Sequence, residues 1–203
     1  MGGLFVTGTD TGVGKTVVSA WLALHLCADY WKPVQSGLDD ETDAEAVARL
    51  TGDAGVGIHP CAFELTQPLS PHEAARRDGI TIKLDDFTLP ETDRPLIVEG
   101  AGGLLVPLND THYMIDLIER LGLPCVLVAR SGLGTINHTL LSLAALRTRG
   151  LPIECVVING PENPANRKAI EDFGGVPVLP LPFFHKPGPR SLAAHQPEGD
   201  ILS

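Results

Sequence analysis

Short apolar runs alternate with segments of helical periodicity along most of the chain. The apolar runs, which predict strands, are residues 4–7, 30–34, 96–99, 125–129, 155–158 and 176–179. The periodic segments, which predict helices, are residues 15–28, 43–50, 71–78, 112–121, 135–149 and 164–173. Several runs are apolar at both alternating sets of positions, which is typical of strands buried on both faces. The alternation therefore predicts an α/β fold in which a mostly parallel sheet is covered by helices on both faces.

No segment of the chain marks a boundary between domains. The 203 residues suffice for one sizeable α/β domain and are few for two. There is no internal repeat and no linker rich in Gly, Pro or Ser. Residues 186–203 form a polar tail with three prolines, and a surface loop, a short closing element and partial disorder are all compatible with it. We expect a single domain over residues 1–203.

Charge and hydropathy narrow the range of partners. Fifteen basic residues against twenty-five acidic ones give a net charge of −10, and the basic residues form no run. Nucleic-acid and anionic-membrane binding are therefore disfavoured, because little would neutralise phosphate groups. No apolar stretch approaches the ~20 residues of a membrane-spanning helix, and the N-terminal segment lacks the pattern of a secretory signal. We expect a cytoplasmic protein.

The cysteines indicate neither a metal site nor a redox site. Cys27, Cys125 and Cys155 lie in apolar helix or strand context and are expected to be small buried side chains. Cys61 lies in a less regular segment, and no two cysteines form a Cys-x-x-Cys pair.

Residues 8–16, Gly-Thr-Asp-Thr-Gly-Val-Gly-Lys-Thr, carry the most specific chemical signal. They join an apolar strand to a predicted helix, the context of a phosphate-binding loop, where backbone N–H groups and the helix N-terminus surround phosphate oxygens. Lys15 would add charge at the terminal phosphates, and the Thr16 hydroxyl suits a magnesium ion. Gly8 and Gly14 enclose five residues, one more than in the general motif. The alternative is an ordinary glycine-rich turn, but the register of Lys15 and Thr16 favours a site for ATP or GTP.

Other polar groups follow neighbouring predicted strands, where ligands of open parallel sheets bind. Glu99 ends an apolar strand beside glycines that permit close backbone approach, so it is a candidate near a nucleotide-bound magnesium ion. An ordinary charged strand end is the alternative. Lys32 lies in a predicted apolar strand. It is a candidate cation for a phosphate or carboxylate group. The alternative is a lysine at the edge of the sheet whose ammonium reaches solvent. Asp43 is a weaker candidate, because Asp is favoured in the first turn of any helix. Thr42 and Glu45 before and after it have the spacing of a capping box.

Five segments, taken together and in their order along the chain, resemble one enzyme family. They are the phosphate loop (8–16), Lys-Pro-Val-Gln-Ser-Gly (32–37), Leu-Ser-Pro-His-Glu-Ala-Ala (69–75), Val-Glu-Gly-Ala-Gly-Gly-Leu-Leu-Val-Pro-Leu (98–108) and Gly-Leu-Gly-Thr-Ile-Asn-His (132–138). As a set they resemble dethiobiotin synthetase, a family whose phosphate loop is lengthened in the same way. The resemblance extends to about residue 183.

The resemblance implies an ATP- and Mg²⁺-dependent cyclo-ligase of biotin biosynthesis with a P-loop fold. Its substrates would be the vicinal diamine diaminopelargonate and CO₂, which form a carbamate that attacks the γ-phosphate before the second amine closes a cyclic urea. The catalytic lysines would be Lys15 and Lys32, and the magnesium ligands Thr16, Asp43 and Glu99. The nucleotide would contact Gly12, Val13, Gly14, Lys15, Thr16, Val17, Asp43, Glu99, Gly100, Ala101, Gly102, Asn159, Pro180, Leu181 and Pro182. The diamine or its carbamate would contact Thr11, Lys32, Ser36, Gly134, Ile136 and Asn137.

The resemblance also implies a homodimer in which residues 134–138 of one subunit lie near the carboxylate tail of the diamine bound to the other. His138 has an alternative role, a local hydrogen bond at a helix N-terminus. Gly12 stands where many relatives carry Glu, so a substrate contact from that side chain would be absent.

Two other functions compete with this interpretation. An amidotransferase-like synthetase usually brings a glutamine-hydrolysing domain, for which 203 residues leave no room. A switch ATPase controlling partner binding commonly has a second lysine early in the loop, where this chain has Thr9, Asp10 and Thr11.

Overall fold

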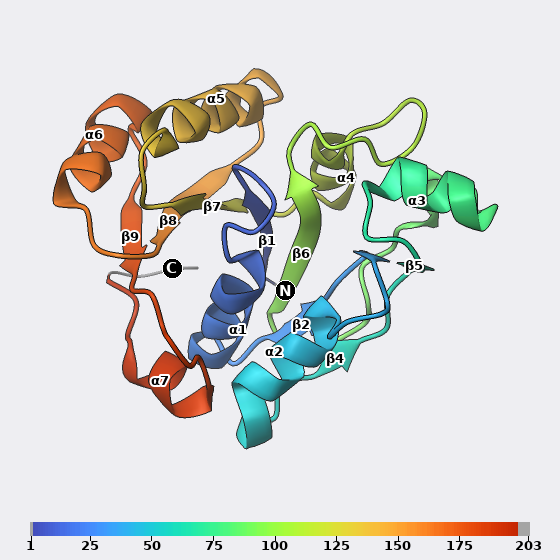
Figure 1. The fold of residues 1–203 in the computed structure, drawn as a ribbon, viewed down its shortest axis with the longest axis horizontal. Coiled ribbons are helices and arrows are strands. Elements are labelled where there is room, and N and C mark those ends of the chain that lie inside the picture. The colour runs from blue at the N-terminus through green and yellow to red at the C-terminus, as the bar shows by residue number, and fades with distance from the viewer. Residues whose placement is uncertain (1, 199–203) are drawn as a thin grey trace.

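The computed structural model describes residues 2–198 and is built around a seven-stranded sheet (Figure 1). The strand order is β4-β2-β6-β1-β7-β8-β9, and every neighbouring pair is parallel. The strands are β1 (Gly3–Gly8), β2 (Asp29–Trp31), β4 (Ile58–His59), β6 (Leu96–Gly103), β7 (Cys125–Arg130), β8 (Ile153–Asn159) and β9 (Val178–Leu181). A second, two-stranded sheet pairs β3 (Val34–Ser36) with β5 (Phe63–Leu65).

Helices cover both faces of the main sheet (Figure 1). One face carries α1 (Lys15–His25), α2 (Asp43–Thr51) and α7 (Pro189–Ala194), and the other carries α4 (Met114–Leu121), α5 (Thr135–Thr148) and α6 (Pro164–Gly174). Helix α3 (Pro71–Asp78) lies beside the small sheet, and short 3₁₀ turns occur at Gly52–Ala54 and Leu84–Asp86. Alternate residues of β1 enter opposite cores: Leu4 packs in the cluster of Trp21, and Phe5 in the cluster of Met114. The predicted fold class is confirmed.

The prediction of one strand over residues 30–34 is wrong. β2 ends at Trp31, and the chain starts β3 at Val34 in the other sheet. Pro33 lies between them and has no N–H to donate to a ladder. Its carbonyl oxygen instead accepts hydrogen bonds from the N–H groups of Ala62 and Phe63, at 3.0 and 3.1 Å. The chain therefore leaves the main sheet at Lys32, which places this lysine at the carboxyl edge.

Smaller differences concern the edges of the fold. The short strands β4 and β5 were not predicted, and the last strand lies at Val178–Leu181 rather than at residues 176–179. Part of the polar tail forms helix α7, which begins with a proline, a residue favoured in the first helical turn. This helix closes over α1: Leu192 is buried, and the indole N–H of Trp21 donates to the His195 carbonyl at 2.6 Å. Residues 199–203 of the tail lie outside the described part of the chain.

Of the three cysteines predicted to be buried, two are buried and one is exposed. Cys125 and Cys155 are buried, and burial raises the pKa of each thiol to about 12. Cys27 is exposed, because α1 ends at His25 and the chain turns away there with a φ of 50° at Cys27. Cys61 is partly buried, and burial raises its thiol pKa to about 11. All four are free cysteines.

Within residues 2–198, no helix is both long enough and apolar enough to cross a lipid bilayer.

Candidate active site

A cleft of about 750 Å³ opens at the carboxyl ends of β1 and β6, between the phosphate loop and the start of α3. Most of the residues predicted for the site line it. They are Thr11, Gly12, Gly14, Lys15, Thr16, Val17, Lys32, Ser36, Asp43, Glu99, Ala101 and Gly102. The remaining lining includes Val34, Gln35, Val106 and the segment from Pro68 to Pro71. The sheet topology therefore brings together segments that are far apart in the sequence.

The phosphate loop is held in place by contacts with distant strands. Gly14 has a φ of 95°, and a Cβ there would lie 2.0 Å from the Asn159 side-chain nitrogen. That Asn159 nitrogen donates to the Val13 carbonyl at 3.0 Å. Lys15 Nζ donates to the Asp10 carbonyl at 3.1 Å, and burial lowers the pKa of Lys15. The loop is thus preformed for phosphate, with its lysine partly stripped of water.

Three oxygen-bearing side chains converge next to the loop. Thr16 Oγ1 lies 2.7 Å from Asp43 Oδ1 and 3.0 Å from Glu99 Oε1. Asp43 starts α2 behind the predicted capping box, which is present: Glu45 N donates to Thr42 Oγ1 at 3.3 Å, and Thr42 N donates to Glu45 Oε2 at 2.8 Å. Asp43 therefore has a rigid position. Its role as an ordinary first-turn aspartate does not account for its contacts with Thr16.

Lys32 lies against the same carboxylates. Its Nζ is 2.6 Å from Asp43 Oδ2 and 3.2 Å from Glu99 Oε1, and it donates to the Gly100 carbonyl at 3.1 Å. Only 3% of the residue is exposed, which excludes an ammonium that reaches solvent. Burial alone would lower the pKa of Lys32, but Glu99 and Asp43 raise it above its ordinary value. Burial would likewise raise the pKa of Asp43, and Lys32 holds it below its ordinary value. The lysine and Asp43 are thus charged together.

Two residues that the sequence did not single out complete this cluster. Tyr30 is fully buried, and its hydroxyl donates to Glu99 Oε2 at 3.0 Å. Burial, followed by the charge of Glu99, raises the tyrosine pKa well above its ordinary value, so the hydroxyl keeps its proton. Gln35 Oε1 accepts the backbone N–H of Asp43 at 3.3 Å. The sequence signal for Tyr30 was its spacing of two from Lys32, which in a strand places both side chains on one face.

Other predicted residues lie outside the lining of the cleft. Val13 is buried in the core, and Gly100 contributes its carbonyl to Lys32. Pro180, Leu181 and Pro182 lie at the end of β9; Leu181 is buried in the core, and its carbonyl oxygen accepts the Gly160 N–H at 2.9 Å. Gly134, Ile136 and Asn137 lie at the start of α5; Gly134 and Asn137 are exposed in this single chain, and Ile136 is partly buried against the core.

The converging oxygens fit a magnesium ion. Mg²⁺ is bound through one or two carboxylates together with water and substrate phosphates, rather than by a cage of protein ligands. Within the described residues, no three His, Cys, Asp or Glu side chains are grouped to hold a metal by themselves. Thr16, Asp43 and Glu99 instead offer a hydroxyl and two carboxylates beside a phosphate loop, which is the donor set expected for a nucleotide-bound metal.

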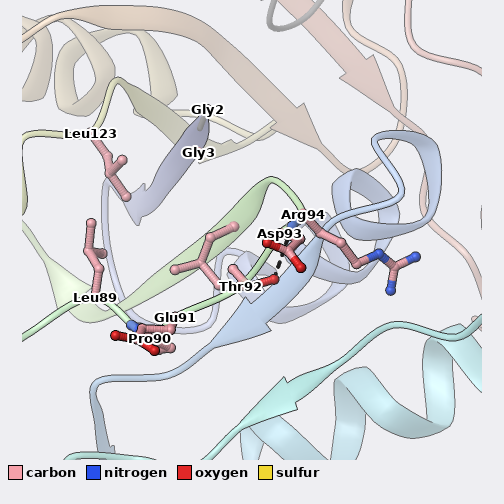
Figure 2. A pocket seen from close by; sticks show the side chains of 10 residues that line it. Gly2, Gly3, Leu89, Pro90, Glu91, Thr92, Asp93, Arg94 and Leu123 are labelled. Atoms are coloured by element: carbon pink, nitrogen blue, oxygen red, sulfur yellow. Dashed lines mark hydrogen bonds between the residues drawn. The ribbon is translucent and has the colours of Figure 1, made fainter.

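A second cavity, of about 600 Å³, lies at the opposite end of the strands, where β1 and β6 begin (Figure 2). Gly2 and Gly3 line it together with the segment from Leu89 to Arg94, and none of the predicted site residues does. Two of its polar side chains serve the fold: Thr92 Oγ1 donates to Asp29 Oδ2 at 2.6 Å, and Arg94 Nη1 donates to Asp29 Oδ1 at 3.1 Å. These contacts hold the start of β2. We therefore take the cleft at the carboxyl ends of the strands, where ligands of parallel α/β sheets bind, as the candidate functional site.

Comparison with known proteins finds relatives of similar sequence and solved structures of similar fold. The AAA domain family matches residues 2–182. The ATP-dependent dethiobiotin synthetase BioD of Paramagnetospirillum magneticum (strain AMB-1) is 63% identical over 186 residues, which cover 90% of each chain. The chain belongs to the dethiobiotin synthetase family. The BioD enzyme of Nitrobacter hamburgensis is 53% identical over 85% of this chain and 82% of its own. The resemblance found in the sequence is confirmed, and with it the assignment of the chain as an enzyme of an ATP-dependent biosynthetic family.

Solved structures agree on the fold alone. The ParA family ATPase of Chlorobium tepidum superposes with a TM-score of 0.53 over 91% of this chain and 86% of its own, at 13% sequence identity. At that identity the likeness establishes the P-loop architecture and carries no information about activity.

Proposed function

We propose that this chain is an ATP- and Mg²⁺-dependent dethiobiotin synthetase. It would join CO₂ to the two amines of diaminopelargonate, form the cyclic urea of dethiobiotin, and release ADP and phosphate. The observation that carries the proposal is the meeting of Lys15, Thr16, Asp43, Glu99 and Lys32 in one cleft. The proposal includes a cytoplasmic location and a single catalytic domain.

The nucleotide would lie along the phosphate loop with its terminal phosphates at Lys15. A magnesium ion bound by Thr16, Asp43 and Glu99 would neutralise charge on the β- and γ-phosphates. The amide nitrogen of Asn159 is already engaged by Val13, so we propose that its amide oxygen accepts a hydrogen bond from adenine. Backbone groups of residues 180–182, at the end of the neighbouring strand β9, would complete the adenine site.

The diamine would occupy the part of the cleft between the phosphate loop and β3. One amine adds to CO₂ and loses a proton, which gives a carbamate. Thr11 and Ser36, which both line the cleft, would hold this group. A carbamate oxygen then attacks the γ-phosphorus and ADP leaves. The second amine attacks the carbamate carbon, phosphate leaves, and the urea ring closes.

Lys32 would stabilise the meeting of the two anions. Its ammonium is held beside the metal carboxylates, at 2.6 Å from Asp43 and 3.2 Å from Glu99. We propose that it exchanges part of these contacts for the carbamate oxygen and the γ-phosphate. Charge that develops between them would be stabilised more in the transition state than in the ground state.

The carboxylate tail of the diamine would extend toward a second subunit. Leu133, just before α5, and Leu141, midway along it, are 105% and 62% exposed in the single chain. Two large apolar side chains exposed beside Gly134, Ile136 and Asn137 support a homodimer interface on this face. We propose that these three residues contact the tail of the diamine bound to the partner subunit.

The reaction is tested by measuring phosphate release from ATP with Mg²⁺ and bicarbonate, with and without diaminopelargonate. We expect release only with the diamine, together with a cyclic urea product identified by mass spectrometry. Diamine-independent hydrolysis without that product would contradict the proposal and favour a switch ATPase.

A further inference from the structure

We infer that Tyr30 is a positioning residue for Glu99, and that through Glu99 it sets the affinity of the site for a divalent cation. This inference rests on the proposed role of Glu99 as a magnesium ligand. Tyr30 itself touches neither the nucleotide nor the diamine in this proposal. It acts by fixing the direction in which one carboxylate presents its oxygens.

The sheet brings the two residues together. β2 and β6 are neighbours, with Tyr30 paired to Ile97 and Trp31 paired to Val98. Side chains alternate between the faces of a strand, so Tyr30 and Ile97 share one face. Glu99 is two residues beyond Ile97 and lies on that same face, within diagonal reach of a long side chain on the neighbouring strand. The face is the one covered by α1, because Tyr30 and Ile97 both lie in the core cluster of Trp21 and Val18.

The two oxygens of Glu99 have different partners. Oε2 accepts the Tyr30 hydroxyl at 3.0 Å. Oε1 lies 3.0 Å from Thr16 Oγ1 and 3.2 Å from Lys32 Nζ, at the corner proposed for the metal. A hydrogen bond to Oε2 restricts rotation of the carboxylate about its terminal bond, and the contacts of Oε1 with Thr16 and Lys32 act in the same sense. Oε1 is therefore directed at the metal corner before any cation binds.

The surroundings make this bond consequential. Tyr30 is fully buried and Glu99 is 1% exposed, so water cannot replace the hydroxyl at low cost. Partners that orient metal ligands typically contribute about 10–100-fold in metal affinity or activity. We expect the loss of the Tyr30 hydroxyl to weaken divalent-cation binding about tenfold. Nucleotide binding without metal should be unchanged, since Lys15 and the loop are not touched.

The experiment measures Mn²⁺ binding in the presence of ADP by electron paramagnetic resonance, with Mn²⁺ as the spectroscopic substitute for Mg²⁺. Tyr30→Phe removes one oxygen and keeps the ring in its place. Tyr113→Phe is the matched control, because Tyr113 is the other of the two tyrosines and is 44% exposed outside the cleft. A tenfold rise in the dissociation constant for Mn²⁺ in Tyr30→Phe alone would support the inference. Equal constants in the two variants would overturn it.

A double-mutant cycle with Glu99→Gln separates this inference from the proposed function. If Tyr30 acts through Glu99, its substitution should have little further effect in the Glu99→Gln background. Should Glu99→Gln alone leave Mn²⁺ binding unchanged, the metal role of Glu99 fails, and the inference fails with it. Should Glu99→Gln weaken binding while Tyr30→Phe does not, only the role of Tyr30 fails.

A measurement without substitution at Tyr30 covers the case in which Tyr30→Phe does not fold. Protein labelled with 3-fluorotyrosine should give two ¹⁹F resonances, one for each tyrosine, and Tyr113→Phe assigns them. We expect Mg²⁺ added with ADP to shift the Tyr30 resonance, and this shift to disappear in Glu99→Gln. A Tyr30 resonance that does not respond to Mg²⁺ would contradict the inference.

Discussion

Replacement of Lys32 by methionine tests whether its buried charge serves both folding and chemistry. The substitution keeps most of the side-chain volume and removes an ammonium that lies 2.6 Å from Asp43 and 3.2 Å from Glu99. Loss of one partner of a buried ion pair typically costs about 3–5 kcal/mol, because the other charge stays buried without compensation. For a domain whose free energy of unfolding is about 5–15 kcal/mol, that is a large fraction.

The pH dependence identifies the cause of the loss. In the unaltered chain the pKa of Asp43 is held below its ordinary value, so the carboxylate stabilises the fold above pH 3.8 and this contribution is lost as the pH falls through the folded-state pKa. Without Lys32, burial should raise the pKa of Asp43, and the folded state would then take up a proton more readily than the unfolded state. The difference in stability between Lys32→Met and the unaltered protein should therefore be largest near neutral pH and shrink toward pH 4.

Urea denaturation at several pH values, with and without Mg²⁺, measures these effects. Mg²⁺ should restore more stability to Lys32→Met than to the unaltered protein, because a cation then replaces the ammonium between the carboxylates. In steady-state kinetics we expect kcat to fall about 100-fold with a smaller loss of ATP affinity, and Lys32→Arg to rescue little.

The control is Lys168→Met, which breaks an ion pair with Asp172 of similar length, 2.9 Å, but on the exposed surface of α6. That variant should differ little from the unaltered protein. A stability loss in Lys32→Met that equals the control, or that does not vary with pH, would refute the reasoning. An intact kcat with only a raised KM for ATP would make Lys32 a binding residue.

Four further predictions follow from the site and the surface. Lys15→Ala should weaken ATP binding in calorimetry and nearly abolish turnover, because it removes the cation at the terminal phosphates. Gly14→Ala should lower the free energy of unfolding by about 1–2 kcal/mol in urea and weaken ATP binding, since φ is 95° and the new Cβ would lie 2.0 Å from the side chain of Asn159. The free energy of unfolding measured in urea should fall as the pH drops below 3.8 toward the lowered pKa of Asp43, and Asp43→Asn should flatten this dependence. Leu141→Glu should shift the protein from dimer to monomer in analytical ultracentrifugation, because its 62% exposed side chain would lie in the proposed interface.

One of these predictions has a matched control variant, and the other three have an outcome that would contradict them. Gly122→Ala matches Gly14→Ala, because its φ is 67° and a Cβ there would meet nothing within 4 Å; only Gly14→Ala should affect ATP binding. Unchanged activity of Lys15→Ala at limiting ATP would show that the loop is misassigned. If the dependence of stability on acid pH is the same in Asp43→Asn, other carboxylates are its cause. If the unaltered protein is a fully active monomer, the proposed dimer is wrong.

Local sequence determined the elements on which the site is built. Helix α3 begins and ends where the periodicity of residues 71–78 predicts, and α1 begins at Lys15 as the phosphate-loop register requires. The capping box before Asp43 was also predictable, because its partners are three residues apart. Such features depend on neighbours in the chain. Their physical causes, side-chain periodicity, capping and turn geometry, are all present in a short window of sequence.

Only the tertiary structure decided which side chains meet. Lys32 and Glu99 are 67 residues apart, and they touch because β2 lies beside β6 rather than beside β1. A short window cannot give this order, because parallel neighbours are chosen by the packing of whole strands and their crossover connections. Pro33 interrupts the predicted strand locally because it has no N–H, but the course that the chain then takes out of the main sheet depends on the distant N–H groups of residues 62 and 63, which donate to its carbonyl. The hydrogen bond from Tyr30 to Glu99 arises in the same way: the sequence supplied a buried tyrosine, and the neighbouring strand made it a partner of the site.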